Sequence, residues 1–459
     1  MNLRESIAAL PFVDTHSHMA GGDEGSAVDD RGGKSLPQVL MSDHLRYLLE
    51  AQGESGALSE YRQWKPEDAE AHMAFVLPLL DRLRHTTAYA AVREGIRELH
   101  PFAGADITGA NWRPINEQVL AAYREHGERA WQRQVAARAN VPLMNQMVVL
   151  PYVTDHWAAL PEDERDRQRR WLLPSLILDG YFFTGFAAQQ RSLGRSLEIL
   201  GVVPRAHGDY LAFLDAVLAR FAAGGGRSVK LMTAYFRTLR FGRVPDMEAE
   251  RLFARGPTNL RGDGLERLQD NLFRHVLDML RRRGLPMIVH TGYATPPDRA
   301  DPGHLLPVLE EFPEIKVDLC HSGWPSHGTA LVFAREFRNC YFNLAWTPLL
   351  SRSLGRRLLS EAIDMLPANK ILIGTDTGTA EAFLGTVRLV RDLLAEVLEE
   401  KVRERQFDAE VATRAVKAIL LDNPLEFYGI SPKAAPGGSD LAPSPGTPGE
   451  GRGGGTLGF

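Results

Sequence analysis

Two histidines near the N-terminus lie two residues apart, in the segment VDTHSH (residues 13–18). Side chains at positions i and i+2 of a β-strand point to the same face, so His16 and His18 project together if this segment is extended. Two adjacent imidazoles form a chelate for a divalent ion such as Zn²⁺. Histidine pairs also arise by chance, so this pair alone is weak support for a metal site.

Three further polar residues share one position in their segments. His290 in PMIVHTG, His321 in KVDLCHSG and Asp376 in KILIGTDTG each close an apolar run, and a glycine follows within two residues. A single residue in this position can simply cap a loop or face solvent. The same placement in three runs, together with the histidine pair, favours one common site for metal binding and acid–base chemistry.

Candidate substrate-binding residues lie close to these runs. Arg237 carries the planar fork of donors that binds a carboxylate through two hydrogen bonds, although most arginines after a strand are solvated or paired with surface acids. Tyr235 precedes Arg237 by two residues, and Trp324 and Trp346 follow two of the apolar runs. Ordinary packing explains large aromatic side chains such as these at least as well as a place in a pocket.

Two other residues are interpreted as structural. His44 belongs to a group of histidines in helical or loop patterns without paired spacing. Cys320 precedes His321 on a predicted strand, so its side chain is expected on the opposite face, as a buried apolar residue and not a nucleophile.

The elements that must position these residues are short apolar runs that alternate with longer amphipathic segments. Strand followed by helix, repeated, is typical of right-handed βαβ units in a parallel sheet. Eight runs suit a closed (β/α)₈ TIM barrel, whose catalytic residues lie at the carboxyl ends of the strands. The predicted strands are FVDTHSHM (12–19), MVVLPYV (147–153), WLLPSLIL (171–178), SVKLMTAYF (228–236), PMIVHTGY (286–293), KVDLCHSG (316–323), CYFNLAW (340–346) and KILIGTDTG (370–378).

Two segments depart from this alternation. Residues 20–146 are mostly helical and contain no convincing strand, so we expect a large insertion after the first strand, either as a cap over apolar surface or as a roof over the pocket. Residues 431–459 hold nine Gly and five Pro and almost no large apolar side chains, which predicts a disordered tail. The barrel itself is expected to span residues 1–430.

Composition excludes several classes of function. The 459 residues are 44% hydrophobic and 24% charged, with a net charge of −5 and a pI near 6.3, which gives no reason to expect nucleic acid or an anionic membrane as partner. Two cysteines, no recognisable leader and no apolar run of membrane-spanning length predict a cytoplasmic protein. A small-molecule substrate is the expected partner, and the sequence leaves open whether the chain forms a homo-oligomer.

The pattern resembles the amidohydrolase superfamily, in particular its amidohydrolase-related branch. The order HxH, His, His and Asp after predicted strands 1, 5, 6 and 8 is that of the family, and LCHSGWP (319–325) and DNPLEFYGI (422–430) are similar to segments typical of this branch. The resemblance covers residue 12 to about residue 430 and is weakest across the insertion. It implies a barrel fold and a bound Zn²⁺ or another divalent ion. The implied metal ligands are His16, His18, His290 and Asp376, with Asp376 also a proton carrier and His321 a ligand or a transition-state group.

Lys230, in SVKLMTAYF, is ambiguous. Some members of the superfamily use a CO₂-modified lysine after strand 4 to bridge two metal ions, but Lys230 lies near the start of its apolar run. An unmodified Lys230 could instead contact a substrate carboxylate or support the site from behind, and a plain structural ion pair is the third interpretation.

The resemblance implies first a metal-dependent hydrolase that activates a metal-bound water against a C–N, C–O or C–C bond of a small, carboxylated substrate. A metal-dependent decarboxylase and a uronate-isomerase-like enzyme are alternatives on the same site, because ligands are shared and selectivity lies in loops. A barrel that has lost catalysis is disfavoured, since all five site residues are present.

Overall fold

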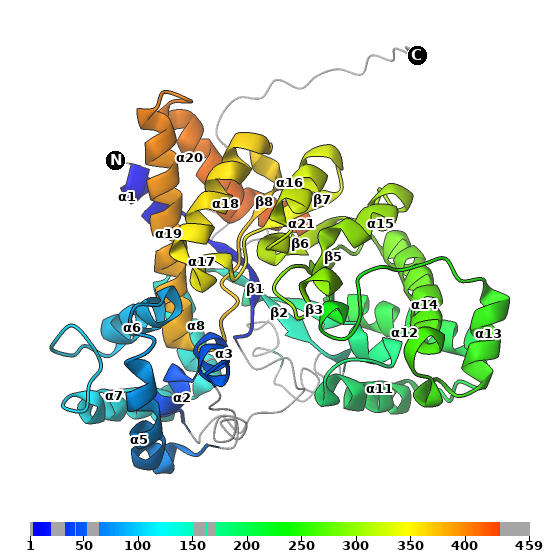
Figure 1. The fold of residues 1–459 in the computed structure, drawn as a ribbon, viewed down its shortest axis with the longest axis horizontal. Helices are drawn as coiled ribbons and strands as arrows, with labels where there is room; N and C mark the ends of the chain where they lie inside the picture. The colour runs from blue at the N-terminus through cyan, green and yellow to red at the C-terminus, as the bar shows by residue number, and fades with distance from the viewer. Residues whose placement is uncertain are drawn as a thin grey trace.

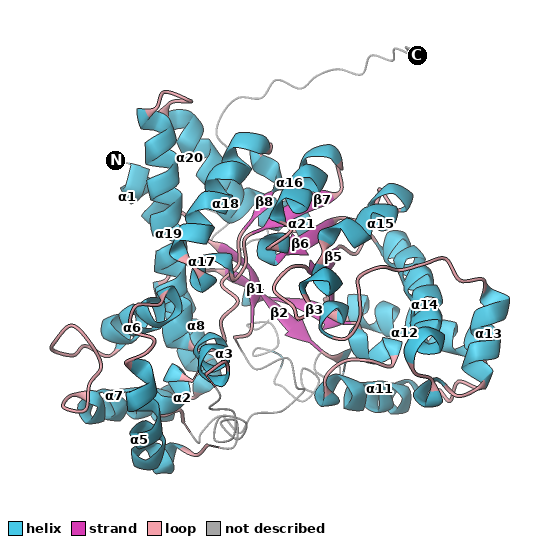
Figure 2. Ribbon diagram, viewed as in Figure 1, coloured by secondary structure: helices cyan, strands magenta, loops and turns pink. Residues whose placement is uncertain are grey.

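The computed structural model describes residues 3–19, 33–41, 43–52, 64–150, 162 and 170–431. Within these ranges eight parallel strands follow one another around a sheet in chain order, each paired with the next. Figure 2 shows the strands at the centre of the structure with helices around them. They are β1 (Val13–Ser17), β2 (Leu143–Val148), β3 (Leu172–Ile177), β4 (Ser228–Leu231), β5 (Met287–His290), β6 (Val317–Cys320), β7 (Cys340–Asn343) and β8 (Ile371–Leu372). The predicted tail lies beyond Ser431, outside the described residues.

Backbone hydrogen bonds between β1 and the chain after β8 close the circle. Thr15 N donates to Ile373 O at 3.3 Å, Asp376 N to His16 O at 2.8 Å, and His18 N to Thr377 O at 3.0 Å. β8 itself is only two residues long, so these bonds, and not a regular ladder, join the first and last strands. The prediction of a (β/α)₈ barrel is confirmed.

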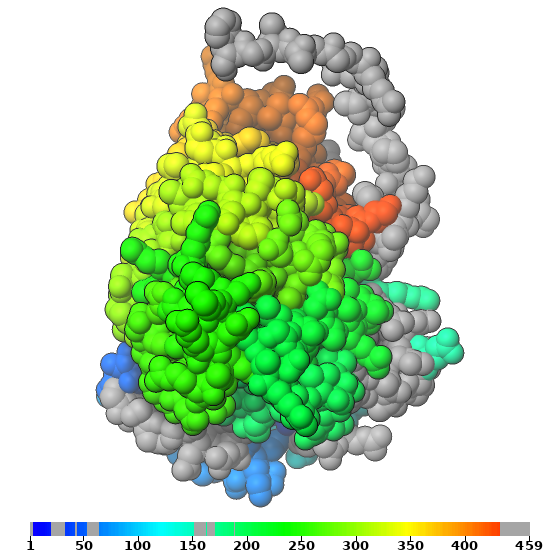
Figure 3. Space-filling model, turned by 90° about the vertical axis from the view of Figure 1, so that its right-hand side faces the viewer, coloured from blue at the N-terminus to red at the C-terminus, as the bar shows by residue number. Residues whose placement is uncertain are grey.

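Helices surround the strands, with α1 packed beside α19 and the helices from α11 to α14 on the opposite side (Figure 1), the side that faces the viewer in Figure 3. α14 shows why they form: it begins near an acidic first turn, ends on three arginines and a left-handed Gly284, and buries one apolar face. The helices that follow β3 and the later strands are α11 (Ala187–Leu200), α12 (His207–Ala223), α13 (Asp246–Ala254), α14 (Gly262–Arg283), α15 (Leu306–Glu311), α16 (His327–Glu336), α17 (Thr347–Leu350), α18 (Arg352–Met365), α19 (Ala380–Arg403), α20 (Ala409–Lys417) and α21 (Asn423–Phe427), and α1 (Leu3–Ala9) precedes β1.

The second strand begins earlier than its apolar pattern predicts. β2 starts at Leu143, whereas the predicted strand starts at Met147 and the predicted insertion runs to Gln146. The pattern fails because polar Asn145 points into the barrel, where its amide donates to Leu173 O at 3.0 Å and to Ser175 Oγ at 2.6 Å. A buried polar side chain with partners is compatible with a central strand, so the insertion ends before Leu143.

The amino end of the barrel is filled by apolar side chains. The first inward residues of several strands, such as Val13 and Leu143, form one cluster with Leu425 and Phe427 of α21. Tyr428 follows that helix and donates its hydroxyl to Thr15 O at 2.8 Å. The barrel is therefore closed at this end, and only the opposite end, where the strands finish, is available for a ligand.

The predicted insertion is helical where it is described, with α2 (Leu36–Leu40), α3 (Asp43–Glu50), α5 (Ala69–Leu80), α6 (Thr87–Leu99), α7 (Trp112–His126) and α8 (Glu128–Arg138). Helix α6 crosses α19 in direct backbone contact: a Cβ on Gly95 would lie 1.8 Å from Glu381 O, and one on Gly385 would lie 1.8 Å from Ala91 O. Only glycine allows helices to approach this closely. The insertion is therefore fixed to the last long helix of the barrel.

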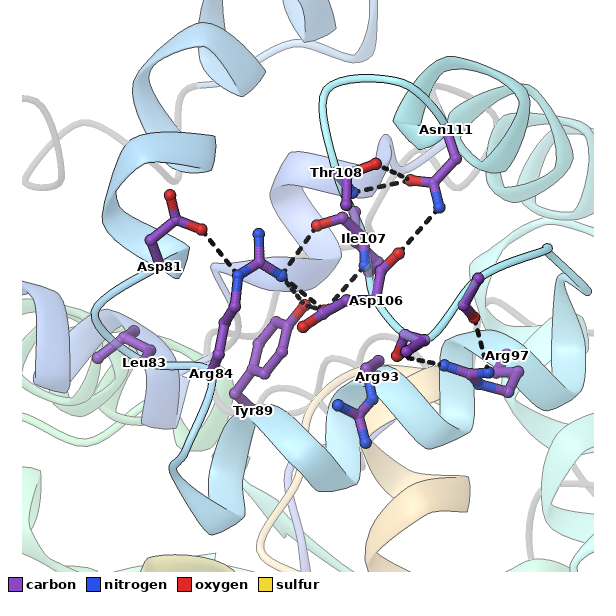
Figure 4. A network of polar contacts seen from close by, with 12 residues as sticks. Asp81, Leu83, Arg84, Tyr89, Arg93, Arg97, Asp106, Ile107, Thr108 and Asn111 are labelled. Carbon is purple, nitrogen blue, oxygen red and sulfur yellow. Dashed lines mark hydrogen bonds and ion pairs between the residues drawn. The ribbon is translucent and has the colours of Figure 1, made fainter.

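A polar network orders the connection between α6 and α7 (Figure 4). Arg84 binds Asp81 and Asp106, each at 2.7 Å, and donates to Ile107 O at 3.0 Å. Tyr89 also donates to Asp106. The network gives this connection fixed partners.

Among the described residues no helix has the length and apolar character to span a membrane.

Candidate metal centre

The two histidines of the N-terminal motif lie at the carboxyl end of β1. His16 is on the strand and 2% exposed, and His18 follows the strand with a side chain that is 24% exposed. The backbone bonds to residues 376 and 377 hold both against the chain after β8. The pairing predicted from their spacing therefore places one buried and one half-buried imidazole at the rim.

Asp376 meets both imidazoles. Its Oδ1 lies 2.9 Å from His18 Nε2 and 3.4 Å from His16 Nε2, and one ligand atom from each of the three residues lies within 4.8 Å of the others. Ligands bound at about 2.0–2.2 Å to one zinc ion are about 3–4 Å apart. These three residues therefore fit a single divalent ion.

The remaining two predicted residues stand beside this group. The ring centre of His321 is 5.2 Å from that of His16 and 4.3 Å from that of His290. His290 does not belong to the set of atoms within 4.8 Å, but its Nε2 is buried without a hydrogen-bond partner among the described residues. An orphaned imidazole nitrogen next to a donor set is suited to a further ligand.

Burial and charge leave the imidazoles neutral and the carboxylate ionised. Burial lowers the pKa of His16 and His290 well below the usual value for imidazole, and that of His321 to about 3. Burial by itself would raise the pKa of Asp376, but His16 and His18 outweigh it and hold that pKa well below its usual range. Neutral imidazoles and a carboxylate are the forms that bind a metal ion.

Lys230 lies beneath the histidines. The apolar run that contains it folds as a short strand that ends at Leu231, so Lys230 is at the carboxyl end of β4 and not near the start of a long strand. Its side chain is 1% exposed, and among the described residues Nζ forms no ion pair and has the neutral Cys320 thiol as its polar neighbour. Its charge further lowers the pKa of His16 and His290. The position is compatible with a bridging or substrate role, and no described ion pair accounts for it.

Cys320 departs from the expectation that it points away from His321. Its sulfur lies within 4.8 Å of ligand atoms of His16 and His321, inside the barrel. The alternation of strand faces does not extend to His321, because β6 ends at Cys320 and His321 has a φ of +71°. Burial raises the pKa of the thiol well above its usual value, so Cys320 is a neutral, buried side chain.

Asp14 is a site residue that the sequence pattern does not reveal as functional. Its carboxylate accepts hydrogen bonds from Thr375 N at 2.9 Å, Thr375 Oγ1 at 2.6 Å and His16 N at 3.1 Å. Burial raises its pKa to about 7. Asp14 thus ties the histidine motif to the loop that carries Asp376, and its only signal was a charged residue inside an apolar strand.

His44 is a second missed residue, contributed by α3 of the insertion. Its Nε2–H donates to the backbone carbonyl of Asp376 at 2.6 Å, and its ring lies 5.0 Å from that of Trp346. Asp376 has a φ of +56°, which a residue with a Cβ adopts only when its surroundings hold it there. His44 and Asp14 provide part of that support. No spacing signal in the sequence could connect residues 332 positions apart.

Of the three substrate-binding candidates, two line a cavity at the rim of the barrel and one does not. Tyr235 and Trp324, together with Trp346, line a cavity of about 580 Å³ at the rim. Arg237 does not line it: its Nη2 lies 2.8 Å from Asp270 Oδ1, and its Nη1 donates to Glu266 O at 2.9 Å and to Gln269 Oε1 at 3.2 Å. With its guanidinium bound to protein partners, Arg237 is not carried into the proposed substrate site.

Comparisons with known proteins place the chain in a family and show proteins of similar fold. The chain is 28% identical over 174 residues to the protein fluG of Emericella nidulans; the match covers 36% of this chain and spans only 20% of that relative. Among solved structures, it resembles a glucuronate isomerase from Caulobacter crescentus (TM-score 0.74, 15% identity, 95% of each chain covered). It also resembles a provisionally assigned metal-dependent hydrolase from Lactobacillus casei (TM-score 0.63, 16% identity, 93% of this chain and 97% of the other). Both likenesses concern the fold. The amidohydrolase family model matches residues 194–430, more than half of the chain, and the protein therefore belongs to the amidohydrolase family.

Proposed function

We propose that this protein is a metal-dependent hydrolase of the amidohydrolase type, acting on a C–N, C–O or C–C bond of a small, carboxylated substrate. The observation that supports it is the meeting of His16, His18 and Asp376 at the open end of the barrel, with ligand atoms within 4.8 Å of one another. The orphaned Nε2 of His290 makes it the proposed fourth ligand. When bound there, Zn²⁺ or a similar ion lowers the pKa of a coordinated water from about 15.7 towards about 7.

Asp376 is the proposed proton carrier. It is ionised, faces His16 and His18, and is only 6% exposed, so a proton that it takes up is shielded from bulk water. His44 and Asp14 hold its loop, so the carboxylate is positioned before substrate arrives. It would take a proton at Oδ and return it to the leaving group, work that contributes about 10²–10⁴-fold to rate.

His321 is better suited to accept than to donate. Its Nδ1–H donates to Ala345 O at 3.2 Å, and its low pKa keeps the ring neutral, so Nε2 carries a lone pair. A neutral ring in this tautomer has no second N–H for a developing oxyanion. We therefore propose His321 as a metal ligand or proton acceptor in preference to an oxyanion donor.

Lys230 provides the remaining positive charge. Because it lies buried beside the histidines and forms no ion pair among the described residues, it can attract the carboxylate of a substrate, or bind CO₂ and bridge a second ion. The first role is the simpler one, since it requires no modification.

A second candidate is an isomerase that moves a proton between neighbouring carbons of a sugar acid. The fold likeness to a glucuronate isomerase over 95% of each chain favours it. The same ligands would serve that reaction, so the two proposals differ in the substrate and not in the metal site.

The test of the proposed metal site is the metal content of the purified chain, measured by elemental mass spectrometry before and after chelation. We expect about one divalent ion per chain, and near-complete loss after dialysis in His16→Ala. The control is His275→Ala, which removes a histidine paired with Asp246 outside the barrel, and it should retain the ion. Wild-type protein that binds no divalent ion, or His16→Ala with full stoichiometry, would falsify the proposal. A screen of esters, amides, lactones and β-diketones against D-glucuronate then separates hydrolase from isomerase.

A further inference from the structure

The cavity above the metal centre is walled by aromatic rings from successive barrel loops. Phe186 follows β3, Tyr235 follows β4, Tyr293 follows β5, Trp324 follows β6 and Trp346 follows β7, and Tyr47 of α3 adds a sixth ring. All of these loops leave the barrel at the rim that carries the candidate ligands. The volume of the cavity, about 580 Å³, is within the usual range for a site that encloses a small molecule.

The rings form two walls that reach the metal centre. In the first wall the ring centres of Phe186 and Tyr235 are 5.8 Å apart, and the ring centre of Tyr235 lies 4.5 Å from that of His290. In the second wall the ring centres of Tyr293 and Trp346 are 4.4 Å apart, and the ring centre of Trp346 lies 5.5 Å from that of His321. A molecule between these walls would therefore have one end beside the histidines.

Several aromatic side chains in these walls are more exposed than large hydrophobic residues that serve packing alone. Among the described residues seven large hydrophobic side chains are notably exposed, and three of these, Tyr47, Phe186 and Tyr293, line this one cavity. Exposed apolar side chains that gather in a concave site mark a place where a ligand binds. None of the described lining residues is charged.

We propose that this cavity binds an aromatic or similarly flat, apolar group of the substrate, while the reactive carbonyl or carboxylate of the same molecule faces the metal centre. The inference rests on the proposed function and narrows its substrate class to aryl-substituted acids and their derivatives. Flat rings gain by stacking between aromatic walls. The hydroxyls of a sugar acid, in contrast, each need a hydrogen-bond partner once they leave water, and this lining offers mainly ring carbons.

The experiment compares two acids that differ by one phenyl ring, propionate and 3-phenylpropionate, on chelated and on Zn²⁺-loaded protein. Dissociation constants come from calorimetry or, for weak binding, from ligand-observed NMR. We expect the phenyl ring to tighten binding by about 10-fold or more in both forms. Zinc should tighten both acids by a similar factor, because it interacts with the carboxylate that they share.

Variants locate the effect. Phe186 belongs to the first wall, and Trp324 belongs to the second, since its ring centre lies 6.1 Å from that of Tyr293. Trp324→Ala and Phe186→Ala should each reduce the advantage of the phenyl ring by about 5-fold or more while leaving the affinity for propionate unchanged. Phe186 is 49% exposed, so its loss should not disturb folding. Trp324→Phe should retain most of the advantage. Leu306→Ala, which removes a 37% exposed side chain outside the cavity, is the control and should bind as wild type does.

Equal affinity for the two acids, or tighter binding of D-glucuronate than of 3-phenylpropionate, would overturn the inference. A phenyl advantage that survives in the chelated protein while zinc tightens neither acid supports the aromatic pocket and contradicts the proposed metal-dependent function. The two failures are thus distinguishable in one set of titrations.

Discussion

Replacing Asp376 with asparagine tests the proposed proton carrier with little change in shape. The main-chain contacts of residue 376, to His16 O at 2.8 Å and from His44 Nε2 at 2.6 Å, do not involve the carboxylate. The amide keeps one carbonyl oxygen of the same size near the two histidines. We therefore expect the variant to fold, and the metal-free protein to lose only the stabilisation that the ionised carboxylate gains from His16 and His18.

The magnitude follows from what the amide lacks. Asparagine has no negative charge and takes no proton near neutral pH. Because Asp376 is only 6% exposed, solvent does not replace the missing acceptor. Loss of a positioned acid–base group costs about 10²–10⁴-fold in turnover, which corresponds to about 2.7–5.5 kcal/mol of barrier. Metal content should fall only in part, since the histidine ligands remain.

The assay pairs metal stoichiometry with turnover on a substrate found in the screen. Asp318→Asn is the matched control, because Asp318 is also fully buried in the barrel and its partner Asn343 Nδ2, at 2.7 Å, can donate equally well to an amide oxygen. Burial raises the pKa of Asp318 to about 7, so an amide resembles its protonated form. We expect the control to keep turnover within a few-fold of wild type. Near-normal turnover with full metal in Asp376→Asn would refute the assignment and make His321 the leading proton carrier.

Two further predictions concern residues supplied or contacted by the insertion. His44→Phe keeps a ring against Trp346 and removes the donor to Asp376 O, so metal affinity or kcat should fall about 10–100-fold with a smaller change in KM. His44→Gln should recover part of the loss, and equal metal affinity together with equal kcat in all three proteins would contradict this role. Glu381→Leu should cost about 3–5 kcal/mol in the free energy of unfolding, because it leaves His100 and Tyr123, bound to the carboxylate at 3.0 and 2.9 Å, buried without their partner. Burial alone would raise the pKa of Glu381, but these two bonds lower it, so the stabilisation is complete above the unfolded value of about 4.3 and is lost as pH falls through the lower folded pKa. Denaturant titrations of wild type and Glu381→Leu from pH 7 to pH 3 should show that the difference in their free energies of unfolding shrinks with acidification. A difference that stays constant would contradict a stabilising role for the charge of Glu381.

The part of the site that the sequence predicts is the part that depends on strand ends. His16, His290 and His321 are found near one another because parallel strands bring their carboxyl ends to one rim, a rule that needs no knowledge of the loops. Asp14 and His44 are missed because their roles arise from backbone partners more than three hundred residues away in the sequence.

Other departures have local causes. The start of β2 was not predicted because polar Asn145, which has hydrogen-bond partners inside the barrel, interrupts the apolar pattern there. Arg237 has the right chemistry for a carboxylate, but the fold places Asp270 within 2.8 Å of it. The sequence predicts the aromatic pocket only in part, through Tyr235, Trp324 and Trp346, because which loop residues face one cavity depends on how the loops turn.

The joining of β1 to the chain after β8 has a consequence for biosynthesis. A ribosome delivers His16 and His18 first, but the residues that close the barrel against them, 373 to 377, emerge only after most of the chain has been made. Until then the nascent N-terminal strand has one neighbour at most, and its two imidazoles are a chelate without the carboxylate of Asp376. Insertion of an ion at the proposed site would therefore be a late event, since Asp376 becomes available only near the end of synthesis. A truncated product of stalled synthesis that ends before residue 373 would carry half of the proposed metal site and an unpaired strand edge, and such an edge promotes aggregation.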